Sequence, residues 1–385
     1  MNFQKQSVVK LNVTKYVKSN ILTDMQYRFK RIAVKIGSNV LTGKDGMLDT
    51  ERMASLVAQI AELHNNGVEV ILVSSGAVAS GRGELHLDKK IDAVKSRQLF
   101  SAVGQVKLLN NYYELFAKHG IRCGQVLTMK ECFSTRRLYL NQKQCIEVML
   151  ENKVIPIVNE NDTVAVTELM FTDNDELSGL MATMMDMEAL VILSNIDGIY
   201  NGNPADEGTF VIREISENDR DLSRFIQTKK SSFGRGGMIT KTNIARKVAK
   251  EGITVIIANG TRENILPDLL KEGSDVVCTT FTPSQKEISS IKKWIAHSDS
   301  YAKGSLIINE KAKAKLLSDE AVSLLPIGVV SIKGEFEKDD IVKIVTEDGV
   351  SIGVGKVSCD SARARSVIGN KGGRPLVHYD YLFLE

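Results

Sequence analysis

Short apolar runs alternate with longer amphipathic segments up to about residue 280. The short runs predict buried strands at 31–36, 68–73, 121–127, 154–158, 190–193 and 254–257. Most of these runs end in glycine, serine or asparagine, which stop a strand and favour a turn. We therefore expect each strand to end in a polar loop.

Apolar residues at three- and four-residue spacing predict helices between these strands. One helix is expected to begin at Asp49 or Thr50, and another to run from Asp173 or Asn174 to about Met185. Further helices are expected at about 95–118, 134–152 and 239–250. Because parallel strands need long crossovers, this order predicts a three-layer αβα domain with a mainly parallel sheet over residues 31–280.

The pattern changes near the C-terminus. Strands are expected at 305–309, 328–333, 341–346, 351–357 and 375–379, separated by turns and with little helical periodicity. Residues 303–385 therefore predict a small, mostly-β domain. The polar segment 281–302, which contains Pro283, is expected to be a connector that is partly helical near Trp294.

Composition sets limits on the class of protein. A chain of 385 residues with 43% hydrophobic and 25% charged residues is typical of a two-domain globular protein. No stretch approaches the roughly 18 continuous apolar residues of a membrane helix. The five cysteines form no Cys-x-x-Cys pair, which argues against a zinc site or disulfide framework and favours the reducing cytoplasm.

Charge is unevenly distributed along the chain. Residues 1–31 carry seven basic residues and one acid, whereas residues 303–385 carry twelve of each. We interpret residues 1–30 as a basic, loosely attached extension; a targeting peptide is the alternative. A tail without net charge disfavours RNA binding as the main function, although five basic residues cluster between 356 and 374.

Five polar segments, three of them with glycine, follow predicted strands or open a predicted helix: 37–39, 74–76, 159–162, 194–195 and 234–237. Any one of them is explained by turn geometry alone. Ligands of an open parallel sheet gather beyond the carboxyl ends of its strands, where glycine lets the backbone approach an anion. Five such segments in one domain therefore predict an anion-binding site.

Two lysines stand beside these loops. Lys35 lies within an apolar strand and must reach the sheet end or find a partner, because burying a bare ammonium is costly. Lys241 follows the 234–237 loop in the first turn of the next helix, where a solvated helix residue is the alternative. Together the two lysines predict a clamp for phosphate groups.

Acidic residues form two clusters, 159–162 and 173–176. They could cap helices, bind a cation, or hold an amino group and a metal-bound phosphate. Neither has the spacing of a calcium loop, and the five histidines are scattered, so no protein metal site is predicted. The chain also lacks the Walker, dinucleotide-binding and protein-kinase motifs.

Five blocks carry a resemblance to a known family: Val34–Ser38, Val73–Ala77, Val158–Thr163, Phe171–Ser178 and Gly234–Lys241. In this order they resemble the signature blocks of the glutamate 5-kinase family, which has the amino acid kinase fold. Segments 323–328 and 336–340 resemble the PUA domain that many bacterial members carry. The resemblance covers nearly everything beyond residue 30.

The resemblance implies roles for individual residues. Lys35 and Lys241 would hold the ATP phosphates, with Asp175 near the reacting groups. The remaining nucleotide contacts would be Gly37, Ser194, Asn195, Arg235, Gly236, Gly237, Met238, Ile239 and Thr240. L-Glutamate would be bound by Ser75, Gly76, Asn159, Asp162 and Asn174. Many members have Thr-Asp where this chain has Ser194-Asn195, so a carboxylate near the nucleotide is missing.

The implied reaction is ATP- and Mg²⁺-dependent phosphorylation of the γ-carboxylate of L-glutamate, the first step of proline biosynthesis. That carboxylate is already ionised at neutral pH, so no general base is needed. The resemblance also implies a homo-oligomer, inhibition by proline and hand-over of glutamyl phosphate to the next pathway enzyme. Alternatives are a kinase of the same fold acting on aspartate, acetylglutamate, carbamate or UMP, and an RNA-binding PUA protein.

Overall fold

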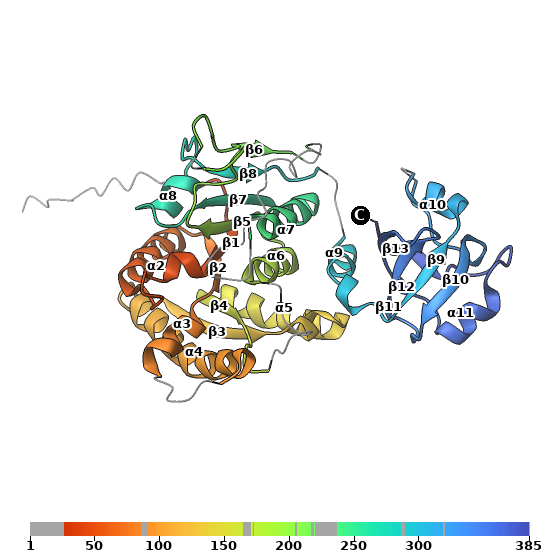
Figure 1. The fold of residues 1–385 in the computed structure, drawn as a ribbon, viewed down its shortest axis with the longest axis horizontal. Helices are drawn as coiled ribbons and strands as arrows, with labels where there is room; N and C mark the ends of the chain where they lie inside the picture. The colour runs from red at the N-terminus through yellow and green to blue at the C-terminus, as the bar shows by residue number, and fades with distance from the viewer. Residues whose placement is uncertain are drawn as a thin grey trace, which may run out of the picture.

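In the computed structural model, described residues are 27–85, 91–164, 171, 173–204, 206–216, 219, 237–285, 289–318 and 320–384. Nearly all of the N-terminal extension, together with Arg235 and Gly236, lies outside them. The described residues form a large α/β unit and a smaller unit built on its own sheet (Figure 1). Among the helices of the described residues, none has the length and apolar character needed to span a membrane.

The large unit is built on an eight-stranded sheet of order β3-β4-β2-β1-β5-β7-β8-β6. Its strands are β1 (Arg31–Ile36), β2 (Glu69–Ser74), β3 (Arg122–Thr128), β4 (Val154–Glu160), β5 (Ala189–Ser194), β6 (Glu214–Ile215), β7 (Thr254–Asn259) and β8 (Thr279–Phe281). All neighbours pair in parallel except β7 and β8. The predicted mainly parallel sheet is therefore confirmed, and β1, β2, β4 and β5 end at the same edge.

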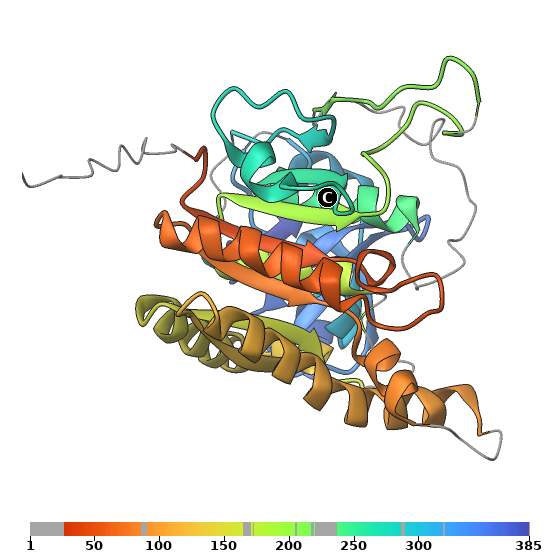
Figure 2. The same cartoon turned by 90° about the vertical axis from the view of Figure 1, so that its left-hand side faces the viewer.

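Helices cover both faces of this sheet (Figure 2). One face packs against α2 (Thr50–Asn65), α4 (Ala93–Ala117) and α8 (Ile265–Leu270). The other packs against α5 (Arg136–Glu151), α6 (Asn174–Met184) and α7 (Met238–Lys250). Short segments α1 (Ser38–Leu41), α3 (Ala77–Glu84) and η1 (Lys130–Phe133) complete the unit.

Strand β1 shows how the sequence decides these faces. Ile32, Val34 and Ile36 belong to the core beneath α2 and α4, whereas Ala33 belongs to the core beneath α6 and α7. Successive side chains of a strand point to opposite faces, so Lys35 lies on the same side as Ala33. The lysine is thereby directed toward the two helices that carry Asp175 and Lys241.

The smaller unit has a five-stranded sheet of order β10-β9-β11-β12-β13. Its strands are β9 (Gly304–Ile308), β10 (Val329–Gly334), β11 (Ile341–Thr346), β12 (Ser351–Val357) and β13 (Val377–Leu384). The mostly-β prediction is confirmed. Two short helices, α10 (Glu310–Leu316) and α11 (Ser361–Val367), and the 3-10 turn η5 (Pro326–Gly328) cover its ends.

The connecting segment contains α9 (Ser290–Ala296) and the 3-10 turn η4 (Asp299–Tyr301). Trp294 and Ile295 are buried in the core of the large unit, and the Trp294 indole nitrogen donates to the Phe133 carbonyl at 2.9 Å. The opposite side of α9 contacts β12 and β13 (Figure 1). Helix α9 therefore packs against both units and joins them.

Candidate active site

A cavity of about 660 Å³ opens at the carboxyl ends of β1, β2, β4 and β5. This is where the ligands of open parallel sheets bind. Ten of the residues predicted from the sequence line it: Lys35, Gly37, Ser75, Gly76, Asn159, Asp162, Asn174, Asp175, Ser194 and Lys241. The fold thus brings together groups that are up to 206 residues apart in the chain, Lys35 and Lys241 being the extremes.

The centre of the cavity holds one buried carboxylate between two lysines. Asp175, in the first turn of α6, is fully buried. Its Oδ1 lies 2.5 Å from Nζ of Lys35, and its Oδ2 accepts from Nζ of Lys241 at 2.7 Å. Lys241 is 9% exposed, so it is not the solvated helix residue that was the alternative.

The two lysines control the ionisation of Asp175. Burial raises the pKa of this carboxyl, but the Lys35 and Lys241 ammonium groups outweigh burial and lower the pKa to about 2. The three side chains therefore carry two positive charges and one negative charge. This leaves one net positive charge facing the cavity, as a phosphate clamp requires.

A second carboxylate lies at the start of α6. Asp173 caps the helix: its Oδ1 accepts from the amides of Asp175 and Glu176 at 2.9 and 3.1 Å. Its Oδ2 is buried without a hydrogen-bond partner among the described residues. Burial and the charge of Asp175 raise the pKa of Asp173 to about 6.

Two glycines shape the wall of the cavity. A Cβ on Gly37 would come within 3.1 Å of the Leu193 carbonyl and 3.6 Å of Nζ of Lys35, so a side chain there would crowd the clamp. Gly76 has φ +108° at the start of α3, a conformation that favours glycine. Residues 77–79 of α3 line the cavity, where helix amides favour an anion.

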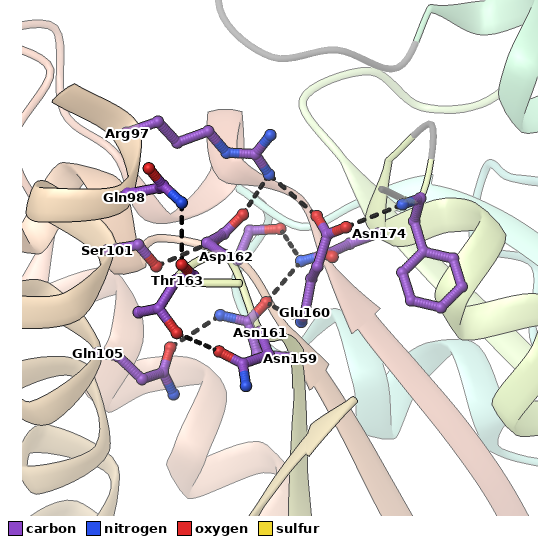
Figure 3. Close-up of polar contacts among 12 residues, drawn as sticks. Arg97, Gln98, Ser101, Gln105, Asn159, Glu160, Asn161, Asp162, Thr163 and Asn174 are labelled. Atoms are coloured by element: carbon purple, nitrogen blue, oxygen red, sulfur yellow. Dashed lines mark hydrogen bonds and ion pairs between the residues drawn. The ribbon is translucent and has the colours of Figure 1, made fainter. Parts of the chain in front are cut away.

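The acids after β4 are already engaged by α4 (Figure 3). Nη2 of Arg97 lies 2.9 Å from Oε2 of Glu160 and also pairs closely with Oδ1 of Asp162. Ser101 donates its hydroxyl to Oδ2 of Asp162 at 3.0 Å. Burial raises the pKa of Glu160, and the nearby charge of Asp162 adds to that rise. The site thus holds a mixed cluster of one guanidinium and two carboxylates.

Sequence reasoning missed the arginines of this cavity. Arg97 lies within α4 and Arg82 within α3, and both line the cavity. On a helix, an arginine is most often a solvated residue, and neither belongs to a predicted strand-end loop. For Arg97, only the packing of α4 across the end of β4 reveals its contacts.

The remaining residues predicted to contact the nucleotide fall into three groups. Ser194 lines the cavity at the end of β5, whereas Asn195 is exposed and lies outside the cavity lining. Met238, Ile239 and Thr240 form the first turn of α7, which Gly237 precedes as the N-cap, and they too lie outside the lining. Arg235 and Gly236 lie outside the described residues.

Comparison with known proteins agrees with this geometry. The model of the amino acid kinase family matches residues 30–259, and that of the PUA domain matches residues 304–375. A protein named glutamate 5-kinase from Bacteroides thetaiotaomicron is 66% identical over 361 residues, covering 94% of this chain and 100% of the relative. Another, from Chlorobaculum tepidum, is 48% identical over 357 residues, covering 92% and 98%.

The chain belongs to the glutamate 5-kinase family.

This glutamate 5-kinase family member joins an amino acid kinase domain to a PUA domain, here the large and the small unit. Among solved structures, carbamate kinase from Giardia lamblia bound to AMP-PNP aligns over 67% of this chain and 99% of its own. The identity is 14% and the TM-score 0.49, too distant to bear on the substrate.

One carboxylate oxygen in the cavity of this family member is suited to face the Mg²⁺ of a bound nucleotide. The described residues contain no group of three or more histidine, cysteine or acidic side chains that could hold a metal ion. Mg²⁺ usually keeps several waters and binds through one or two carboxylates together with substrate phosphates. The unpartnered Oδ2 of Asp173, which lines the cavity near the lysine clamp, suits that arrangement.

Proposed function

We propose that this chain transfers the γ-phosphoryl group of ATP to the γ-carboxylate of L-glutamate, giving L-glutamyl 5-phosphate and ADP. The reaction would be the first step of proline biosynthesis. One observation carries the proposal: a two-lysine clamp around Asp175 shares one cavity with polar groups suited to an amino acid. The relatives named glutamate 5-kinase support glutamate as that amino acid.

The difficulty of this reaction is charge. A carboxylate oxygen of glutamate must approach the γ-phosphorus, forming an O–P bond as the bond to the β-phosphate oxygen breaks. No proton is transferred, since the carboxylate is ionised at neutral pH. Lys35 and Lys241 neutralise negative charge on the transferring group, and their buried positions strengthen that effect. Asp175 holds both ammonium groups in place.

Mg²⁺ would supply further neutralisation when bound to the ATP phosphates. Asp173 is the residue that would face it, through coordinated water or directly. The amides opening α3 extend the positive lining. Positioning the two anions in line within this lining accounts for most of the remaining catalysis.

Glutamate carries an ammonium group and a second carboxylate that must also be recognised. Asp162 provides a counter-charge for the ammonium, since each of its oxygens can accept more than one hydrogen bond. Arg97 lines the same cavity, and a guanidinium can bind a carboxylate through two parallel hydrogen bonds, so it is suited to the α-carboxylate. Ser75 adds a neutral hydroxyl to the same wall.

Regulation and assembly follow the family resemblance. Proline presents the same ammonium and carboxylate and would compete with glutamate for these groups. We also propose a homo-oligomer that passes the unstable acyl phosphate to the next enzyme of the pathway. The five cysteines are unpaired in the structure, which suits the cytoplasm as the place of this reaction.

The test is ADP release by the full chain across a panel of acceptors, with hydroxylamine present to trap an acyl phosphate as a hydroxamate. We expect turnover with L-glutamate that depends on ATP and Mg²⁺. Aspartate, acetylglutamate, carbamate and UMP serve as the competing acceptors. Equal or faster turnover with any of these four would overturn the glutamate assignment.

A further inference from the structure

Two asparagines and a glutamine form a chain of hydrogen bonds behind the cavity wall (Figure 3). Gln105, on α4, is 8% exposed, and its Oε1 accepts from Nδ2 of Asn159 at 2.9 Å. Oδ1 of Asn159 accepts from the amide of Glu160 at 2.9 Å and from Nδ2 of Asn174 at 3.0 Å. The nitrogen and the oxygen of the Asn159 side-chain amide are therefore both hydrogen-bonded. Exchanging them by rotation would place donors against donors and acceptors against acceptors.

The chain fixes Asn174 as well. Its Nδ2 lies 3.1 Å from the Ser74 carbonyl, 3.0 Å from Oγ of Ser75 and 3.0 Å from Oδ1 of Asn159. Two of these three are carbonyl oxygens, which can only accept, so the amide nitrogen must be on this side. The carbonyl oxygen of Asn174 is consequently left on the other side of the amide, in a residue that lines the cavity.

The same bond sets the direction of the Ser75 hydroxyl. Because Oγ of Ser75 accepts from Asn174, its own proton remains available to donate. Neighbouring residues thus offer the substrate opposite polarities: an acceptor on Asn174 and a donor on Ser75. An α-amino acid, with an ammonium beside a carboxylate, matches that pair.

We propose that Gln105 is a positioning residue for substrate recognition. By holding Asn159 in one orientation, it makes Asn174 present its carbonyl oxygen to the substrate ammonium and Ser75 its hydroxyl to a substrate carboxylate. This deepens the proposed function and rests on it. Without the Gln105 acceptor, Asn159 can turn and Asn174 keeps only its bonds to Ser74 and Ser75. The amino acid is then bound less tightly, while the nucleotide is not affected.

The test compares Gln105→Met, which keeps the length of the side chain but removes the acceptor, with Gln105→Glu, which retains an acceptor. We expect Gln105→Met to raise the KM and calorimetric Kd for L-glutamate about tenfold, the effect of one buried hydrogen bond. The KM for ATP should stay within twofold. Gln105→Glu should restore the glutamate KM to within threefold. If Gln105→Met does not fold, Gln105→Leu takes its place, and the same changes in KM and Kd are expected.

Gln59→Met is the matched control. Gln59 is also a buried helical glutamine, and its Oε1 accepts from the Leu266 amide at 3.0 Å. Unlike Asn159, the partner of Gln105, its hydrogen-bond partners Ser55 and Leu266 do not line the cavity. The control should lower the melting temperature without changing either KM. An unchanged glutamate KM in Gln105→Met would overturn the inference, as would equal rises in both KM values. A wild-type chain that binds glutamate without releasing ADP would instead overturn the proposed function, and the Kd comparison would still decide the role of Gln105.

Discussion

The two units of this chain differ in whether they bury charged side chains. In the large unit, Lys35, Glu160, Asp162, Asp175, Lys241 and Glu251 are each at most 9% exposed. In the described residues of the PUA domain, the buried polar side chains are Thr346 and Ser361, and no charged side chain is buried. Most of its buried apolar residues form one cluster, while Ile341 and Val354 join the core of the large unit.

This difference indicates that the buried charges of the large unit serve its function rather than its stability. Removing charges from water costs several kcal/mol per ion, and a buried pair rarely repays that cost in stability. Five of the six buried charges line one cavity, so the large unit tolerates an arrangement that stability alone does not favour. The charges of the PUA domain form exposed pairs such as Lys356–Asp339, which contribute little to either stability or chemistry.

The largest expected effect comes from removing one lysine of the clamp. Lys241→Ala should lower kcat by roughly 10²- to 10³-fold, because its charge matters most in the transition state. Lys356→Ala, the matched change in the PUA domain, should leave kcat within twofold. Steady-state kinetics of both variants make the comparison, and a Lys241→Ala enzyme with near-normal kcat would refute the clamp.

An intermediate effect is expected at α9, where the two units meet. Trp294→Phe removes the indole donor and leaves the buried Phe133 carbonyl unsatisfied. The free energy of unfolding should fall by about 2 kcal/mol, measured by circular dichroism in urea, with kcat within threefold. Tyr379→Phe, at an exposed residue of β13, is the control and should change the free energy of unfolding by less than about 0.5 kcal/mol. A similarly small loss for Trp294→Phe would show that α9 is only a connector.

The smallest effect is a gain of stability at the site. The pKa of Asp173 is raised to about 6 in the folded protein. Ionisation of this carboxyl therefore lowers the free energy of unfolding as the pH rises from about 4 through 6. Asp173→Asn keeps the helix cap and should be more stable than wild type by about 1–2 kcal/mol at pH 7.5. The difference should vanish below pH 4, where the carboxyl is protonated in both states.

Urea unfolding at the two pH values measures that gain. Asp360→Asn, the same change at the residue that caps α11, should give no comparable gain at either pH. We also expect Asp173→Asn to lower kcat, since the residue is placed to face Mg²⁺. A gain in stability that persists at pH 4 would mean that charge is not its cause.

Hydrophobic pattern was sufficient to predict the elements that bury a complete face. Strands β1, β11 and β12 begin and end at the predicted residues, and α7 and β4 differ by at most two residues. The pattern did not indicate α3, α8 or α10, which are 8, 6 and 7 residues long. Such helices are held by tertiary packing and leave weak local signals.

The site shows the same division. Lys35, Ser75 and Asp162 lie at strand ends, which converge in a parallel sheet, whereas Asp175 was expected at the site from the family resemblance. Arg97 and Gln105 could not be predicted, since they lie within α4 with nothing local to distinguish them. Their role depends on how α4 crosses the end of β4, which no spacing along the chain records.

The most direct test of the central claim follows the oxygen atoms. L-Glutamate labelled with ¹⁸O at both γ-carboxylate oxygens would be incubated with the enzyme, Mg²⁺, ATP and hydroxylamine. If the carboxylate attacks the γ-phosphorus, hydroxylamine cleaves the acyl phosphate at carbon and the released phosphate carries one ¹⁸O atom, measured by mass spectrometry. Phosphate released in step with ADP but without ¹⁸O would show that water is the acceptor and would contradict the account.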